Sequence, residues 1–488
     1  MINKSSQKIF NNSLLYSLGT VLSKAVGFFL VPIYTYFIAK DDYGIGTTIT
    51  SFVSTFGIVI MLSLRAAMIR FYNEYDDEEK KRFVGTITCF VLINSVVVCT
   101  LLCLLNKLYM PFLFKGVDFF PCVFWGVMSL GAEGIYLVYQ SLMQAKQDGK
   151  AYSLNSVVYL IFHGLTVVLF VGVLRMGVLG MVLSNFASNI AFAVYGIISM
   201  SRKKCIIVCI DGAMLKKSLK YSLPILPHNM SNNLNTYSIK LVISHFLGYA
   251  MSGLYTLASQ FSTIVNLVQN SVNLAFRPWF VEQMQLGKEG RAQIKYMSCM
   301  IMALYAFCSV GVALFSKEII VIMSEHTYWE AWRMVPLFVL AQLISFIYYS
   351  HVQTLMYNVK MSKFTVICSF SGLVVNVGVS LLLVQRLEAY GILIAMIISK
   401  IVLSSVAVIM SNRAENVDFG LPKMILYILL AAVLSGAGMW VAQISGEGIH
   451  ILEILVKLVL LVIAAVAFML PYRKDFGILI KGIIKKKK

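Results

Sequence analysis

The stretch "YFIAKDDYGIGT", from Tyr36 to Thr47, interrupts a strongly apolar chain with two aspartates and two glycines. A second stretch, "HFLGYAMSGLYT" from His245 to Thr256, has Phe, Gly and Thr at the same spacing. Long apolar runs flank both stretches, so each is expected to form the turn of a hairpin between two membrane helices. In this interpretation the chain turns at Tyr43-Gly44, and the two aspartates remain in contact with water on the outer side.

The two stretches extend into a longer internal repeat. A shift of 209 residues aligns Phe37 with Phe246, Gly44 with Gly253, Thr47 with Thr256, Phe52 with Phe261 and Phe71 with Phe280. Farther along, a shift of 213 aligns Gln140 with Gln353, Met143 with Met356 and Lys150 with Lys363, and a shift of 214 aligns Gly177 with Gly391. Small loop insertions would produce this drift, although Gly and Phe also recur by chance in membrane chains.

The composition is that of an integral membrane protein. Hydrophobic residues make up 59% of the 488 residues and charged residues only 13%, whereas soluble domains carry roughly a quarter charged residues. The mean hydropathy is +0.80. Continuous apolar runs such as "VVLFVGVL" favour helices over the alternating strands of a membrane barrel. The fold class is therefore expected to be an all-α polytopic membrane protein.

Apolar runs between polar breaks predict about fourteen transmembrane helices. They cover residues 12–38, 43–70, 83–105, 119–145, 151–174, 177–200, 221–247, 253–280, 296–316, 334–358, 363–385, 391–411, 424–444 and 449–470. With the repeat, they form two six-helix halves plus two C-terminal helices. Because each half crosses the membrane an even number of times, the halves are expected to be related by an axis along the membrane normal.

This pattern predicts four parts of the chain. They are an N-terminal six-helix lobe at 1–200, a basic cytoplasmic linker at 201–220, a C-terminal six-helix lobe at 221–412, and two additional helices with a basic tail at 413–488. The segment "MINKSSQKIFNNSLL" lacks the small-residue cleavage site of a signal peptide, so it is expected to enter a retained first helix.

The positive charges predict the orientation. Of the 41 Lys and Arg residues, 27 lie in segments on the same side as the termini, seven on the opposite side and seven within or at the ends of helices. The positive-inside rule then predicts that both termini are cytoplasmic. It also accounts for the net charge of +19 without nucleic-acid binding.

Four intramembrane cations are the candidate substrate-binding charges: Lys24, Arg65, Lys240 and Arg277. A charge within the hydrocarbon is unfavourable by several kcal/mol unless it faces water, protein or a ligand. Arg65 and Arg277 lie near the cytoplasmic ends of the repeat-equivalent second and eighth helices, about one turn apart in register, while Lys24 and Lys240 lie deeper. The alternative for cations near a helix end is that they extend to the lipid headgroups.

The predicted seventh helix is unusually polar, with the run "HNMSNNLNTYSIK". It is expected to line a wet cavity or to pack against another polar surface. Asn232, Asn235 and Tyr237 are its candidate substrate-binding residues, because amides and hydroxyls suit sugars as well as phosphates. Glu133, an isolated acid at mid-membrane, is a candidate ion-coupling residue that could also pair with a nearby cation.

No catalytic, cofactor or metal site is predicted. The chain lacks HExxH, GxSxG and the GK[ST] phosphate loop, so it is expected not to be an enzyme and to need no cofactor. Cys205 and Cys209 have no second cysteine pair at zinc-site spacing. Glu453 and Lys457 are spaced i, i+4 and are expected to pair with one another.

A specific set of residues lies within the first 45 positions: "NSLLYSLG" from Asn12 to Gly19, then Phe28, Pro32, Tyr34, Thr35 and Tyr43-Gly44. It resembles the opening of the polysaccharide biosynthesis proteins, the Wzx-type lipid-linked oligosaccharide flippases of the MOP exporter superfamily, whose fold is MATE-like. The fourteen spans, the two halves and the basic central linker agree with this resemblance over nearly the whole chain.

The resemblance implies a multi-pass flippase of the bacterial inner membrane. It would move undecaprenyl-diphosphate-linked oligosaccharide repeat units to the periplasmic leaflet by alternating access through a cationic cavity, for capsule, exopolysaccharide or O-antigen synthesis. Membrane lipids, a polymerase and glycosyltransferases are the implied partners.

Three alternatives stay open. Lipid II flippases belong to the same superfamily and also have fourteen spans and cationic cavities. Multidrug exporters of the MATE branch usually have twelve spans and an acid in the first helix, where this chain has Lys24. Polysaccharide polymerases or ligases usually carry a large periplasmic loop, but the longest outer loop expected here, about Ser316–Arg333, is short.

Overall fold

The computed structural model describes residues 27–358, 361 and 364–473, and nearly all of this part of the chain is helical. Its internal contacts divide the chain into two compact units, one ending at Thr256 and the other starting at Leu257. Helix α12 (Tyr249–Gln285) begins in the first unit and continues into the second.

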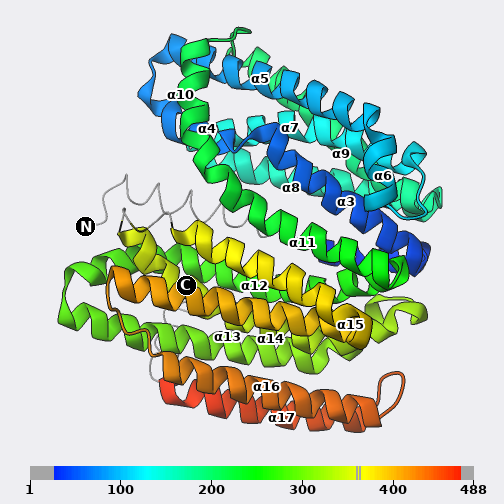
Figure 1. Cartoon of the computed structure of the whole chain (residues 1–488), viewed down its shortest axis with the longest axis vertical. Coiled ribbons are helices and arrows are strands. Elements are labelled where there is room, and N and C mark those ends of the chain that lie inside the picture. The colour runs from blue at the N-terminus through cyan, green and yellow to red at the C-terminus, as the bar shows by residue number, and fades with distance from the viewer. Residues whose placement is uncertain (1–26, 359–360, 362–363, 474–488) are drawn as a thin grey trace, which may run out of the picture. The chain divides into compact units, whose positions relative to one another are not determined.

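The helices of the first unit are coloured from blue to green in Figure 1. They are α2 (Val31–Phe37), α3 (Lys40–Met61), α4 (Leu64–Phe71), α5 (Asp77–Leu104), α6 (Asn106–Leu113), α7 (Phe124–Ala145), α8 (Gly149–Val167), α9 (Gly177–Arg202), α10 (Gly212–Ser222) and α11 (Leu226–Phe246). Short helical turns η1 (Tyr72–Glu74), η2 (Phe119–Val123), η3 (Val168–Val173) and η4 (Leu223–Ile225) join some of them.

The second unit holds α13 (Lys288–Met323), α14 (Val335–Tyr357), α15 (Phe364–Ala414), α16 (Leu421–Ile444) and α17 (Ile451–Met469), with turns η5 (His326–Met334) and η6 (Leu470–Tyr472). The segment α15 is two helices that meet at Glu388, whose backbone is not helical. They match the predicted helices at 363–385 and 391–411. Helices α16 and α17 lie side by side.

The number of spans agrees with the fourteen predicted. Among the described residues, ten helical segments are long and apolar enough to cross a membrane. One of them is α15, which consists of two successive helices and therefore counts as two spans. The more polar α11 and α12 are two further helices of spanning length. The predicted first helix, of which Gly27–Phe37 is described, completes the count.

The predicted hairpin at the opening stretch is confirmed, but its turn lies earlier than expected. Ile38 is extended, and α3 already begins at Lys40. Tyr43 and Gly44 are therefore helical residues, and the prediction that the chain turns at them was wrong. Asp41 and Asp42 occupy the first turn of α3, where free N–H groups and the helix dipole favour negative charge.

The predicted helix 43–70 is interrupted near its C-terminal end. Leu62 and Ser63 have φ angles of 44° and 58°, a left-handed conformation that non-glycine residues rarely adopt. The break separates α4 from α3, so Arg65 lies in the first turn of a separate short helix. A uniform apolar run gives no signal of such a break.

Residues 207–222, which include most of the predicted basic linker, form an ordered strap on the first unit. The Ile207 amide donates to the Lys81 carbonyl over 3.1 Å, and a Cβ on Gly85 would overlap the Ile207 carbonyl oxygen. Helix α10 then packs on α4, where the Lys217 ammonium contacts Glu74 at 3.1 Å. Lys217 also lies 4.6 Å from the centroid of the Phe71 ring, so both charge and an aromatic face hold the strap.

Candidate functional site

The two predicted arginines lie in similar surroundings, one in each unit. Arg65 on α4 is half-buried and Arg277 on α12 is exposed, and neither has an ion pair among the residues that the structure describes. Arg65 lies close enough to Tyr136 on α7 to act on it electrostatically. Arg277 does the same to Tyr349 on α14.

The tyrosines beside these arginines are repeat equivalents, because the shift of 213 that aligns Gln140 with Gln353 also aligns Tyr136 with Tyr349. The Gln140 side chain donates to the Tyr136 hydroxyl over 2.7 Å, and the Gln353 side chain donates to the Tyr349 carbonyl over 3.1 Å. Each unit thus supplies an arginine that acts electrostatically on a tyrosine. Sequence reasoning found the arginines but not their aromatic neighbours, which the repeat could have indicated.

The other two predicted cations are Lys24 and Lys240. Lys24 lies outside the described residues. Lys240 is 7% exposed, and its ammonium donates to the Thr47 carbonyl of α3 over 3.1 Å. The Thr47 carbonyl thus takes the place of water as a partner for the buried ammonium group. In this conformation Lys240 is bound to α3.

The polar seventh helix corresponds to α11, and part of its polar face packs against α3. The Asn229 side chain donates to the Ser63 hydroxyl over 3.1 Å, at the break before α4, and Asn233 donates to the Ser54 carbonyl over 3.0 Å. With Lys240, these contacts form a polar seam along α3. The expectation that α11 would pack against another polar surface is confirmed for these residues.

The three predicted substrate-binding residues of α11 have different surroundings. Asn232 is exposed, Asn235 is half-buried and Tyr237 is buried. The Tyr237 ring lies 5.8 Å from that of Phe52 and belongs to the aromatic core of the first unit. Asn232 therefore remains accessible in this conformation, whereas Tyr237 packs in the core.

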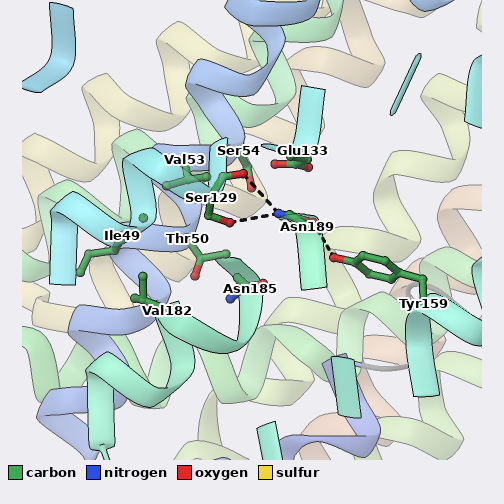
Figure 2. A pocket seen from close by; sticks show the side chains of 11 residues that line it. Ile49, Thr50, Val53, Ser54, Ser129, Glu133, Tyr159, Val182, Asn185 and Asn189 are labelled. Carbon is green, nitrogen blue, oxygen red and sulfur yellow. Dashed lines mark hydrogen bonds between the residues drawn. The ribbon is translucent and has the colours of Figure 1, made fainter. Parts of the chain in front are cut away.

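Glu133 lies in a polar pocket inside the first unit, between α3, α7, α8 and α9 (Figure 2). The cavity has a volume of about 90 Å³. Its polar lining consists of Thr50, Ser54, Ser129, Glu133, Tyr159, Asn185 and Asn189. Within the described part of the chain, no cation pairs with Glu133, so the alternative of an ion pair finds no partner there.

Hydrogen bonds order one wall of this pocket. The Tyr159 hydroxyl donates to the Asn189 side-chain Oδ1 over 2.8 Å, and the Asn189 side-chain Nδ2 donates to the Ser129 hydroxyl over 3.0 Å. Figure 2 shows these hydrogen bonds beside Glu133. A carboxylate among fixed amide and hydroxyl oxygens can take up a proton or a small hard cation. In the described residues, no cluster of three His, Cys, Asp or Glu residues could hold a metal ion.

Other intramembrane charges neutralise one another in the second unit. Glu453 pairs with Lys457 at 2.6 Å, as predicted, and with Lys317 at 2.8 Å. Lys457 also pairs with Glu318 at 2.6 Å, and all four side chains are buried. The Lys317 ammonium further contacts the Ala442 carbonyl at 3.1 Å, near the C-terminus of α16. We call these four residues the buried quartet; it fixes α16 and α17 to α13.

Solved structures with the same fold are membrane transporters. The chain is similar to the lipid II flippase MurJ in an inward closed conformation, with a TM-score of 0.72 and 15% identity over 93% of this chain and 99% of that one. It is also similar to a multidrug resistance MATE transporter of the MOP superfamily in an inward-facing conformation, with a TM-score of 0.65 and 13% identity over 82% of this chain and 94% of that one.

A third similar structure is the Vibrio cholerae MATE transporter VcmN in the bent form, with a TM-score of 0.55 and 13% identity over 86% of this chain and 98% of that one. These likenesses establish a MOP-type, MATE-like fold for a multi-pass membrane protein. No curated protein sequence matches the chain. The family model described as polysaccharide biosynthesis protein matches residues 9–284, which is more than half of the sequence, and the chain therefore belongs to the polysaccharide biosynthesis protein family.

Proposed function

We propose that this protein is a flippase that moves undecaprenyl-diphosphate-linked oligosaccharide repeat units across the bacterial inner membrane, for capsule, exopolysaccharide or O-antigen synthesis. The observation that carries the proposal is membership of the polysaccharide biosynthesis protein family. The MOP-type fold supports transport rather than a chemical conversion of the substrate. Both termini would be cytoplasmic, as the distribution of Lys and Arg indicates.

Arg65 and Arg277, which have no ion pair with any residue that the structure describes, support an anionic headgroup as the transported group. Arginine keeps its charge in apolar surroundings and binds phosphate oxygens through two parallel N–H donors. In this proposal Arg65 and Arg277 receive the diphosphate near the cytoplasmic side, and Lys24 binds it deeper. Lys240 would join them only after it leaves the Thr47 carbonyl, which makes its ligand role dependent on a conformational change.

The sugars would meet the amides of α11, among them Asn232 and Asn235, while Tyr237 would support that surface from the core. The lobes proposed at 1–200 and 221–412 would alternate in access, with 201–220 as the linker between them and 413–488 as an added helix pair. A polymerase and glycosyltransferases would act on the same substrate.

Glu133 is the proposed coupling residue. Its pocket has oxygen donors on four helices of one unit, so binding of a proton or sodium ion there would change how these helices pack. This links an ion gradient to the conformation of the first unit.

Flipping of lipid II is the second candidate function, and the likeness to MurJ favours it. At 15% identity that likeness establishes the fold alone, whereas the family match concerns polysaccharide biosynthesis. MATE-type export of small molecules has less support, because the described part of the first helix, Gly27–Phe37, contains no acidic residue.

Complementation of a strain that lacks its oligosaccharide flippase tests the proposal. The wild-type chain should restore surface polymer, and Arg65→Ala and Arg277→Ala should each reduce it at least tenfold. Arg386→Ala, an exposed arginine of the second unit, is the matched control and should complement fully. Rescue of a lipid II flippase deletion, with no surface polymer in the first strain, would instead establish the second candidate.

A further inference from the structure

Helix α12 carries a polar stripe that the sequence analysis did not identify. Its residues recur at three- and four-residue spacing and end at Arg277: they are Ser259, Ser262, Thr263, Asn266, Asn270, Asn273 and Arg277. This spacing places them on one face of the helix. At 1.5 Å per residue the stripe is about 27 Å long, close to the thickness of the hydrocarbon layer.

The opposite face of α12 packs in the core. Leu257, Phe261 and Val265 are 0%, 2% and 1% exposed, whereas Asn266 and Asn270 on the stripe are half-buried. The helix is therefore oriented by its apolar side, and the middle of the stripe, at Asn266 and Asn270, is only partly covered. A row of amides facing lipid would leave several polar groups without partners, so the stripe must face water, protein or a ligand.

The amides of the stripe have unused hydrogen-bonding capacity. The Asn270 side-chain Nδ2 donates to the Asn266 side-chain Oδ1 over 2.6 Å, which leaves further donors and acceptors on both side chains. Asn273 is 7% exposed, and its amide nitrogen has no hydrogen-bond partner within the described part of the chain. A buried amide donor without a partner is unfavourable, and a ligand that accepts its hydrogen bond would remove this penalty.

The Ser262 hydroxyl contributes less to recognition, because it already donates to the Ser259 carbonyl over 2.7 Å. The three asparagines thus determine what the stripe can bind. Each presents a donor and an acceptor side by side and carries no charge, which matches the neighbouring hydroxyl groups of a neutral sugar. Arg277, at the predicted cytoplasmic end, is the only charged member and matches a phosphate.

We infer that the asparagines Asn266, Asn270 and Asn273 bind the neutral sugar rings of the lipid-linked substrate while Arg277 binds its diphosphate. This inference rests on the proposed function. It adds that α12 selects the substrate by its neutral sugars. The stripe would thus distinguish substrates by their glycan, since every undecaprenyl-diphosphate carrier offers Arg277 the same headgroup.

Binding to the purified full-length chain in nanodiscs tests the inference with two probes. One is undecaprenyl diphosphate without sugar, and the other is the lipid-linked repeat unit extracted from the source strain lacking its polymerase. Wild type should bind the glycosylated probe more tightly than the bare one. The double variant Asn266→Leu/Asn270→Leu and the single variant Asn273→Leu should reduce this preference about tenfold or more and bind the bare lipid as wild type does.

Two further variants separate the possible failures. Gln260→Leu removes an amide from α12 outside the stripe and should keep the wild-type preference, while Arg277→Ala should weaken binding of both probes. Unchanged glycan preference in both asparagine variants would overturn the inference and leave the proposed function standing. If wild type binds neither probe, both are overturned. Melting temperatures within a few degrees of wild type establish that the variants are folded.

Discussion

The hydroxyl groups of Thr47 and Thr256 lie 3.2 Å apart and form a hydrogen bond between α3 and α12. These two residues are equivalent under the shift of 209 that the sequence predicts. Beside them, a Cβ on Gly44 would overlap the Tyr249 carbonyl oxygen, and a Cβ on Gly253 would overlap the Lys40 carbonyl oxygen. Each glycine thus faces the carbonyl four residues before the other, which is the reciprocal pattern of a local two-fold axis.

Gly44→Ala and Gly253→Ala are expected to destabilise the protein, because each added methyl group meets backbone atoms that cannot move aside by a change of rotamer. Overpacking of this kind typically reduces the free energy of unfolding by about 1–3 kcal/mol. Thermal unfolding in detergent should show a lower Tm for both variants. Gly436→Ala is the control, since nothing lies within 4 Å of the added Cβ, and its Tm should stay the same or rise. Equal Tm values for all variants would refute the close contact.

The sequence predicted the architecture well for physical reasons. Spans follow from the length of apolar runs, and α7 with its preceding turn covers Phe119–Ala145, the range predicted. The predictions were less accurate for helix ends that local polar contacts determine. Helix α5 begins at Asp77 rather than at residue 83, because Asp76 and Glu79 form a capping box.

The candidate site was less predictable, since burial and partners depend on packing between distant segments. Lys240 was predicted by its depth in the membrane, but no one-dimensional pattern indicates that it contacts the Thr47 carbonyl. The pocket around Glu133 likewise combines residues from α3, α7, α8 and α9. The stripe on α12, in contrast, has a helical periodicity that the sequence analysis missed, and the structure adds which face of the helix is buried.

The buried quartet should respond differently to charge imbalance and to balanced removal. Lys457→Met removes the quartet partner of Glu318 and leaves Glu453 paired with Lys317. Breaking a buried pair in this way typically destabilises by about 3–5 kcal/mol. The double variant Glu318→Met/Lys457→Met keeps the balanced Lys317–Glu453 pair and should recover much of the loss. Thermal unfolding of the two variants measures the difference. A double variant no more stable than the single one would contradict this account.

Glu133→Gln should uncouple transport from the ion gradient, because glutamine keeps the shape of the side chain but cannot exchange a proton or balance a cation. In proteoliposomes, substrate movement by wild type should accelerate when a proton or sodium gradient is imposed, and the variant should show less than a tenth of this acceleration. Glu282→Gln, an exposed glutamate near the end of α12, is the matched control. Wild-type acceleration in the Glu133 variant would exclude this residue as the coupling site.

The ion pair between Lys217 of the strap and Glu74 should depend on pH, because Glu74 can take up a proton. The hydrogen bond from Lys217 lowers the pKa of Glu74 below its ordinary value of 4.5, so the carboxylate is charged at neutral pH and the contact is formed. A lowered pKa means that this contribution is present above the ordinary pKa and is lost as the pH falls through the folded value. Glu74→Gln should reproduce the loss at pH 7, measured as several-fold faster hydrogen exchange of the amides in 207–222. Glu78→Gln, which changes an exposed glutamate in the first turn of α5, should exchange like wild type. Equal rates for Glu74→Gln would show that aromatic packing alone holds the strap.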